Sequence, residues 1–280
     1  MSFREHYSRL VQHIGDVGAE EVNERTGAVI HVGRPSSFTL DLMDGMLPVC
    51  GIRKTFPRSA AAEVAWFLQG EKDVDFIRGY APLWDKFVEE DGRTVAGAYG
   101  HRWRRHFGRD QIADAEAALI ANPSDRRVFI SAWDPAQDGL GRPSKNVPCP
   151  VGFTLSVTAG RLSSTLLIRS SDVFVGLPYD VMGHALLMKA IQVDLEATGV
   201  APEGLGYMQV SLAHPHVYDV HVPMLREAFA GSPSDSSIAL PSDWGVGRIG
   251  LDPHGYVARV AEAAKHIQQP SYHCRPEVMV

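Results

Sequence analysis

Four β-rich or alternating segments lie among helical segments, and the two kinds follow no regular order along the chain. The strand segments read RRVFISAW, GFTLSVT, RLSSTLLIR and GYMQVSLA, and such composition and alternation predict β-strands. The helical segments are PRSAAAEVAWFLQGE, which ends at Gly70, DQIADAEAALIANP, which begins at Asp110 and stops before Pro123, and HGYVARVAEAAKHI. A regular strand–helix repeat would favour a parallel sheet, so this irregular order predicts an α+β or irregular α/β fold.

The chain shows no sign of division into several domains. No repeat, low-complexity block or long linker interrupts its 280 residues, and residues 134–146, DPAQDGLGRPSKN, form a polar loop rich in Gly and Pro. The hydrophobic content of 45% and the charged content of 21% are ordinary for a soluble globular enzyme. We therefore predict a single domain over residues 1–280.

Charge and cysteine content narrow the class of partner and the compartment. The net charge of −6 argues against broad attraction to nucleic acid or to an anionic membrane. The first twenty residues contain charges throughout and no signal-peptide core, and no run approaches the ~20 apolar residues of a membrane span. The three cysteines are widely separated, which indicates a reducing compartment. A cytoplasmic location is predicted, and an anionic ligand would need a local cluster of arginines.

Several kinds of chemistry find no support in the motifs. The chain has no GxGxxG, P-loop or kinase signature, so dinucleotide and ATP chemistry are not predicted. His214, His216 and His221 in HPHVYDVH match no zincin spacing, and no CxxC accompanies them. We predict no metal site and favour structural or substrate-contacting roles for these histidines.

The segment 168–180, IRSSDVFVGLPYD, raises a specific question about its final acid. Arg169 and Asp172 lie at the end of a strand segment, and Asp180 precedes a long amphipathic helical segment. Because Asp is a favoured N-cap, Asp180 is expected to begin that helix. The alternative is that its carboxyl group recognises a ring inside a pocket.

Cys149 and several arginines are candidates for chemistry. Cys149 lies between two prolines in NVPCPVGF, and although a lone cysteine is commonly a buried small hydrophobe, fixed backbone and nearby arginines would favour a thiolate. A Cys–His hydrolase would require a base that no local pattern selects. The adjacent Arg126 and Arg127, together with Arg25 and Arg169, supply enough guanidinium groups to bind a phosphate dianion if they converge.

These segments occur in an order that resembles the thymidylate synthase superfamily, over residues 20–230. ERTG is similar to the phosphate-loop segment of that family, AEVAWFLQG to the helix with its catalytic glutamate, and LWDKF and GAYGHRW to its cofactor and active-site segments. NPSDRR resembles the arginine pair, VPCP the nucleophile segment, and RSSDVFVGLPYD the most specific signature. The resemblance implies a thymidylate synthase-like fold in which a mixed sheet packs with helices and the sheets stack across a homodimer.

The resemblance also implies a role for each matching residue. The implied catalytic residues are Cys149 as nucleophile, Glu63 and Asp180. The implied substrate-binding residues act on the phosphate, the base and the sugar hydroxyl, and they are Arg25, Arg126, Arg127, Arg169, Ser170, Tyr99, His216 and Tyr218. Arg126 and Arg127 would reach across the dimer to the partner's phosphate. The implied cofactor-binding residues are Trp84, Asp172 and Gly176.

Three positions depart from the synthase pattern. Pro150 replaces a histidine, Ile168 replaces a glutamine, and Asp180 replaces an asparagine that reads uracil. A protonated carboxyl group can donate to the bare ring nitrogen of cytosine and accept from its exocyclic amine. The resemblance is therefore closest to the cytidylate 5-hydroxymethylase branch, in which aspartate occupies this place.

The implied reaction converts dCMP, 5,10-methylenetetrahydrofolate and water into 5-hydroxymethyl-dCMP and tetrahydrofolate through a covalent Cys149 adduct. Three alternatives remain open. They are a CMP 5-hydroxymethylase of nucleoside metabolism, a thymidylate synthase that methylates dUMP, and an inactive nucleotide-binding homologue.

Overall fold

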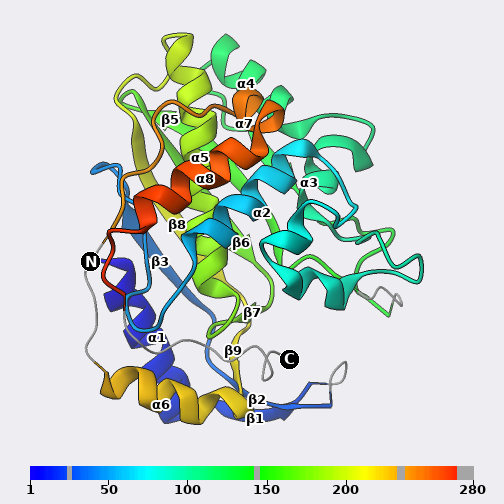
Figure 1. The fold of residues 1–280 in the computed structure, drawn as a ribbon, viewed down its shortest axis with the longest axis vertical. Coiled ribbons are helices and arrows are strands. Elements are labelled where there is room, and N and C mark those ends of the chain that lie inside the picture. Colours follow the sequence, from blue (N-terminus) through cyan, green and yellow to red (C-terminus); the bar gives the residue numbers. More distant parts are fainter. Residues whose placement is uncertain (24–26, 142–145, 232–236, 270–280) are drawn as a thin grey trace.

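The computed structural model describes residues 1–23, 27–141, 146–231 and 237–269. Its helices pack against mixed sheets (Figure 1), so the predicted α/β fold is confirmed. In the described part of the chain, no helix combines the length and apolar character that a membrane crossing requires.

The larger sheet has five strands in the order β3-β8-β6-β5-β4. Its strands are β3 (Ser36–Asp41), β4 (Phe129–Ser131), β5 (Pro150–Thr158), β6 (Arg161–Ile168) and β8 (Leu205–Leu212). Only the β6–β8 pair is parallel. A tight turn joins β5 to β6, where Ala159 and Gly160 both have positive φ angles, 49° and 71°, which suits the twist of a two-residue hairpin.

The smaller sheet follows the larger one where β6 and β8 end. It comprises β1 (Ala19–Val22), β2 (Val29–Val32), β9 (Pro215–Tyr218) and β7 (Ser171–Asp172), in that spatial order. The chain passes from β6 to β7 through Arg169 and Ser170, and from β8 to β9 through two residues as well. The Ala213 amide donates to the Ile168 carbonyl and the Ser171 amide to the His214 carbonyl, which joins the sheets across the break. Arg169 and Ser170 therefore lie where the strands change direction.

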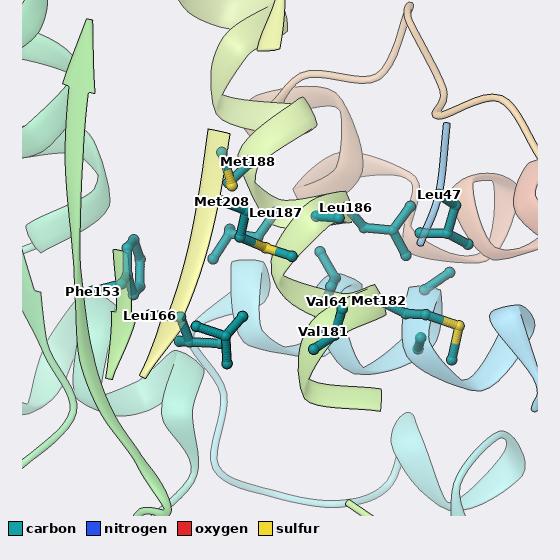
Figure 2. Close-up of a cluster of buried hydrophobic side chains, with 14 of the residues drawn as sticks. Leu47, Val64, Phe153, Leu166, Val181, Met182, Leu186, Leu187, Met188 and Met208 are labelled. Atoms are coloured by element: carbon teal, nitrogen blue, oxygen red, sulfur yellow. The ribbon is translucent and has the colours of Figure 1, made fainter. Parts of the chain in front are cut away.

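One face of the larger sheet is covered by helices. These are α5 (Leu177–Ala197), which packs on β6 and β8, then α2 (Pro57–Gln69), which packs on α5, and α8 (Pro253–Ala264), which packs on α2 (Figure 1). Figure 2 shows Val64 of α2 and Met182 of α5 in the apolar core, with Leu166 and Met208 of the sheet. Proline in the first turn of α2 and a left-handed Gly70 after its end set the limits of that helix.

The opposite face of the larger sheet has a different character. In β6 every second residue is buried, and the residues between are partly exposed. Tyr207 of β8 and Phe129 of β4 are 50% and 47% exposed. The sheet thus has one face in the core and one that presents polar residues and a few large apolar residues.

The remaining helical elements surround this framework. They are α1 (Phe3–Val17), η1 (Ile77–Gly79), η2 (Pro82–Phe87), α3 (Tyr99–His101), η3 (Arg102–His106), α4 (Gln111–Ala121), η4 (Asp219–His221), α6 (Val222–Ala230) and α7 (Val246–Leu251). The predicted cap of α4 is confirmed, since the Asp110 side chain accepts from the Ala113 amide.

The predicted start of α5 is wrong. The helix begins at Leu177 with Gly176 as its N-cap, and Asp180 lies inside the first turn. Pro178 is compatible with that turn because the first amides of a helix have no intrahelical acceptor. Asp180 is therefore not an N-cap, and its carboxyl group is available for another role.

Candidate active site

Cys149 lies directly before β5, opposite the break between the two sheets. Its amide donates to the Tyr99 hydroxyl at 3.2 Å, and its carbonyl accepts from the Arg169 amide at 2.8 Å. The residue is partly exposed. These two hydrogen bonds fix the backbone of Cys149, while its thiol stays partly accessible.

Arg169 brings a positive charge to the same strand end. Its guanidinium group donates to the carbonyls of Val147 and Pro148 at 3.4 Å and lies 5.6 Å from the centre of the Trp133 ring. Arg169 and Cys149 thus converge in one subunit. A partly exposed guanidinium beside the Cys149 segment can bind an anion.

Glu63 projects from α2 into an aromatic cluster. The Trp84 indole N–H donates to Glu63 Oε1 at 2.8 Å, and the Trp84 ring lies 4.9 Å from that of Trp66 and 5.9 Å from that of Phe87. Burial raises the pKa of Glu63 to about 7, against the smaller opposing effect of the indole bond. A carboxyl group with a pKa near neutrality suits proton transfer in either direction.

Asp180 is the most strongly perturbed acid of the site. Burial and, to a smaller extent, the negative charges of Glu63 and Asp172 together raise its pKa to about 8. The carboxyl group is therefore protonated at neutral pH and can donate a hydrogen bond with one oxygen while the other accepts.

Tyr99 links the nucleophile to these acids. Burial raises its pKa well above the usual value, and the neighbouring charges of Cys149, Asp180 and Glu63 act in the same direction. Since its hydroxyl accepts from the Cys149 amide, its own proton remains available for a second partner. One cluster is thus formed by residues from α2, α3, α5 and the segment before β5, namely Glu63, Tyr99, Asp180 and Cys149.

Gly176 and Asp172 lie beside this cluster. A Cβ at Gly176 would meet the Asp172 carbonyl oxygen at 3.3 Å and Asp180 Oδ2 at 3.8 Å. Asp172 Oδ1 accepts from the amides of Phe174 and Val175 at 3.0 and 2.9 Å. A side chain at Gly176 would thus begin within contact distance of the Asp172 backbone and the Asp180 carboxyl group.

His216 and Tyr218 lie buried on β9. The His216 ring is 5.5 Å from the Tyr218 ring, and His216 pairs with Asp172 of β7 in the strand register. Burial lowers the pKa of His216, more than the Asp172 charge raises it, so the imidazole is neutral at pH 7. The Tyr218 hydroxyl accepts from the Asn23 side chain at 3.4 Å.

Arg126 and Arg127, two of the predicted phosphate ligands, lie apart from this cluster. Arg126 and Arg127 are exposed, and Arg127 forms a two-point ion pair with Asp125 at 2.9 and 3.0 Å. In the described ranges, no hydrogen bond or ion pair joins either arginine to the Cys149 region. Ser170 is partly exposed at the strand break, and Arg25 lies outside the described residues.

Sequence reasoning missed two residues that contact the site. Trp133 lies against Arg169, and the buried Arg53 donates to the Phe174 and Val175 carbonyls. No local sequence pattern predicts these contacts, because each joins residues that lie more than thirty positions apart in the sequence. The segment GIRKTFP, which contains Arg53, indicates only charged residues before a helix.

The site brings together a thiol, a guanidinium group and two carboxyl groups of raised pKa. The family model for thymidylate synthase matches residues 5–242, and the chain belongs to the thymidylate synthase family. The family transfers a one-carbon unit from methylenetetrahydrofolate to a pyrimidine nucleoside monophosphate. The resemblance to the superfamily noted in the sequence is thus confirmed, whereas the hydroxymethylase branch belongs to the proposal below.

Proposed function

We propose that the enzyme is a dCMP 5-hydroxymethylase that forms 5-hydroxymethyl-dCMP through a covalent bond to Cys149. The observation that carries this assignment is the Asp180 carboxyl group in the first turn of α5, whose pKa is raised to about 8. A protonated acid matches cytosine, because it donates to the ring nitrogen and accepts from the exocyclic amine. Uracil presents a ring N–H and a carbonyl oxygen at these places, and a protonated carboxyl can pair with these too. The preference for cytosine therefore rests on the proton that Asp180 can give to the bare ring nitrogen, because the uracil ring N–H offers no lone pair there.

The chain's own residues support the early steps. A Cys149 thiolate attacks carbon 6 of the cytosine, which makes carbon 5 nucleophilic, as in other covalent mechanisms. Asp180 supplies a proton at the ring nitrogen and so neutralises the charge that develops on the ring. Arg169, beside the Cys149 strand end, favours the thiolate and holds the phosphate.

The residues around Glu63 fit the folate. Trp84 and Phe87 supply aromatic surface for a pterin ring, the Asp172 carboxylate can accept from its amino group, and Gly176 leaves space beside them. When bound, 5,10-methylenetetrahydrofolate supplies the one-carbon unit. Glu63, oriented by the Trp84 indole, holds the water whose oxygen becomes the product hydroxyl and moves its proton.

The choice of substrate has a direct test. Incubation with dCMP, CMP or dUMP and methylenetetrahydrofolate, followed by mass analysis, should give a hydroxymethyl product chiefly from dCMP. CMP is the second candidate. In this proposal His216 and Tyr218, whose rings lie 5.5 Å apart, contact the sugar hydroxyl, and that role does not distinguish a deoxyribose from a ribose. Methylation of dUMP would identify a thymidylate synthase, and no product from any nucleotide would identify an inactive homologue.

We further propose a homodimer in which Arg126 and Arg127 of the partner subunit complete the phosphate site. Both arginines are exposed before the edge strand β4, and the neighbouring sheet face exposes Phe129 and Tyr207. Stacking of two such faces would bury these rings. Residues 1–280 form one catalytic domain in this proposal, since α8 beyond the family match packs on α2.

Mixing two inactive variants tests the shared site. Cys149→Ala and Arg127→Ala subunits are each expected to be inactive, and refolding them together should restore activity in hybrid dimers with one intact site. The measurement is turnover of dCMP after mixing, with each variant mixed with itself as the control. Well-folded hybrids without activity, or a monomer at assay concentration, would contradict the shared site.

A further inference from the structure

Arg53 is a buried arginine, 2% exposed, in the segment before α2. Its Nε donates to the Phe174 carbonyl at 2.9 Å, its Nη2 to the Val175 carbonyl at 3.1 Å, and its Nη1 to the Lys54 carbonyl at 3.0 Å. The guanidinium carbon also lies 5.2 Å from the centre of the Phe174 ring and 5.8 Å from that of Tyr179. The rigid fork of the guanidinium thus fixes two consecutive carbonyl groups.

The same two residues are held on their other side by Asp172. Its Oδ1 accepts from the Phe174 and Val175 amides at 3.0 and 2.9 Å. The turn between β7 and α5 therefore has its amides bonded to an anionic side chain and its carbonyls to a cationic one. Hydrogen bonds with one charged partner are the stronger kind, so two charged side chains restrain the position of this turn.

This turn leads directly to the acid of the site. The Gly176 amide donates to the Asp172 carbonyl at 3.0 Å, and the Asp180 amide donates to the Gly176 carbonyl at 3.0 Å. Asp180 lies one turn of helix beyond Gly176. A displacement of the Phe174–Val175 peptides would move the first turn of α5, and the Asp180 carboxyl with it.

We propose that Arg53 is a positioning residue for base recognition, since it holds the turn that sets where the Asp180 carboxyl lies relative to Cys149 and Glu63. This inference rests on the proposed role of Asp180 in reading cytosine. Arg53 acts through the backbone, because the charged groups that face Asp180 are Glu63 of α2 and Asp172 of β7, with the Tyr99 hydroxyl beside them.

Arg53→Lys tests the proposal, because a single ammonium group cannot reproduce the fork to Phe174, Val175 and Lys54. A displacement of about 1 Å at a reacting geometry lowers rates by about a hundredfold. We expect kcat/KM for dCMP to fall by about tenfold to a hundredfold, with a smaller fall for dUMP, so that the dCMP:dUMP ratio decreases. The matched control is Arg102→Lys, a second buried arginine that pairs with Asp138 at 3.1 Å and does not bond to this turn. It should destabilise the protein without changing the ratio.

Two measurements separate this inference from the proposed function. A carbon-13 titration of the Asp180 carboxyl, assigned with Asp180→Asn, reports its surroundings without any substrate, and Arg53→Lys should lower its apparent pKa as water enters. If Arg53→Lys does not fold, hydrogen exchange of the Arg53 Nε–H in the wild type decides, because that group donates to the Phe174 carbonyl and should be protected. A wild type without cytosine preference would overturn the proposed function. An unchanged ratio and titration in folded Arg53→Lys, or rapid exchange of the Arg53 Nε–H, would overturn the role of Arg53.

Discussion

Replacement of Cys149 by alanine or serine is expected to abolish turnover while nucleotide affinity stays within about tenfold. The thiol supplies the bond to carbon 6 that activates the ring, whereas the phosphate, base and sugar contacts come from other residues, such as Arg169 and Asp180. Exchange of the carbon 5 hydrogen with solvent should vanish too, because it requires the carbon 6 adduct. Turnover and hydrogen exchange are measured by product mass and by proton NMR of dCMP in deuterated buffer.

Cys50, another cysteine of the chain, provides a matched control. Cys50 is fully buried and its thiol bonds weakly to the Arg53 carbonyl at 3.6 Å, so Cys50→Ala should retain most of the turnover. Substantial turnover in Cys149→Ala, with folding verified by circular dichroism, would remove the covalent mechanism.

Local patterns predicted β4, β5, β6 and β8 and the helices α2, α4, α5 and α8, but not the other elements or the limits of those at the site. The alternation of GFTLSVT and RLSSTLLIR marks β5 and β6 because one face of the sheet is buried. In the segment RRVFISAW, which was predicted to be a strand, only Phe129–Ser131 form one. The two arginines precede this edge strand. The start of α5 was misplaced because a favourable cap residue, Asp180, follows a proline that the first helical turn accommodates.

The assembly of the site lies beyond local patterns. Glu63, Tyr99, Cys149 and Asp180 lie far apart in the sequence and meet only because α5 packs on the larger sheet and α2 packs on α5. Only the resemblance to a family predicted from the sequence that these residues share a site. The raised pKa values of Glu63 and Asp180 arise mainly from burial, which only the folded chain provides. The dimer and the role of the two exposed arginines stay predictions.

Asp180→Asn is expected to shift preference from dCMP towards dUMP. The amide cannot transfer a proton to the ring nitrogen, and in the orientation that matches uracil its N–H would face the cytosine amine, donor against donor. An unsatisfied buried polar group costs about 1–3 kcal/mol, or on the order of tenfold to a hundredfold in binding. The loss in kcat should be larger, because proton transfer to the ring is lost as well. The measurement is the ratio of kcat/KM for dCMP and dUMP in both proteins.

The pH dependence of the same variant gives an independent check. Wild-type kcat/KM for dCMP should fall as the pH rises above about 8, where Asp180 loses its proton, and this part of the fall should be absent in Asp180→Asn. In the unfolded chain the carboxyl ionises at about pH 4, whereas the folded protein retains its proton up to about pH 8. The wild type therefore loses stability as the pH rises across this interval. Asparagine does not ionise, so the thermal midpoint of Asp180→Asn relative to wild type should increase between these two pH values. An unchanged substrate ratio together with a pH-independent difference in midpoint would show that Asp180 is neither a buried acid nor the group that reads the base.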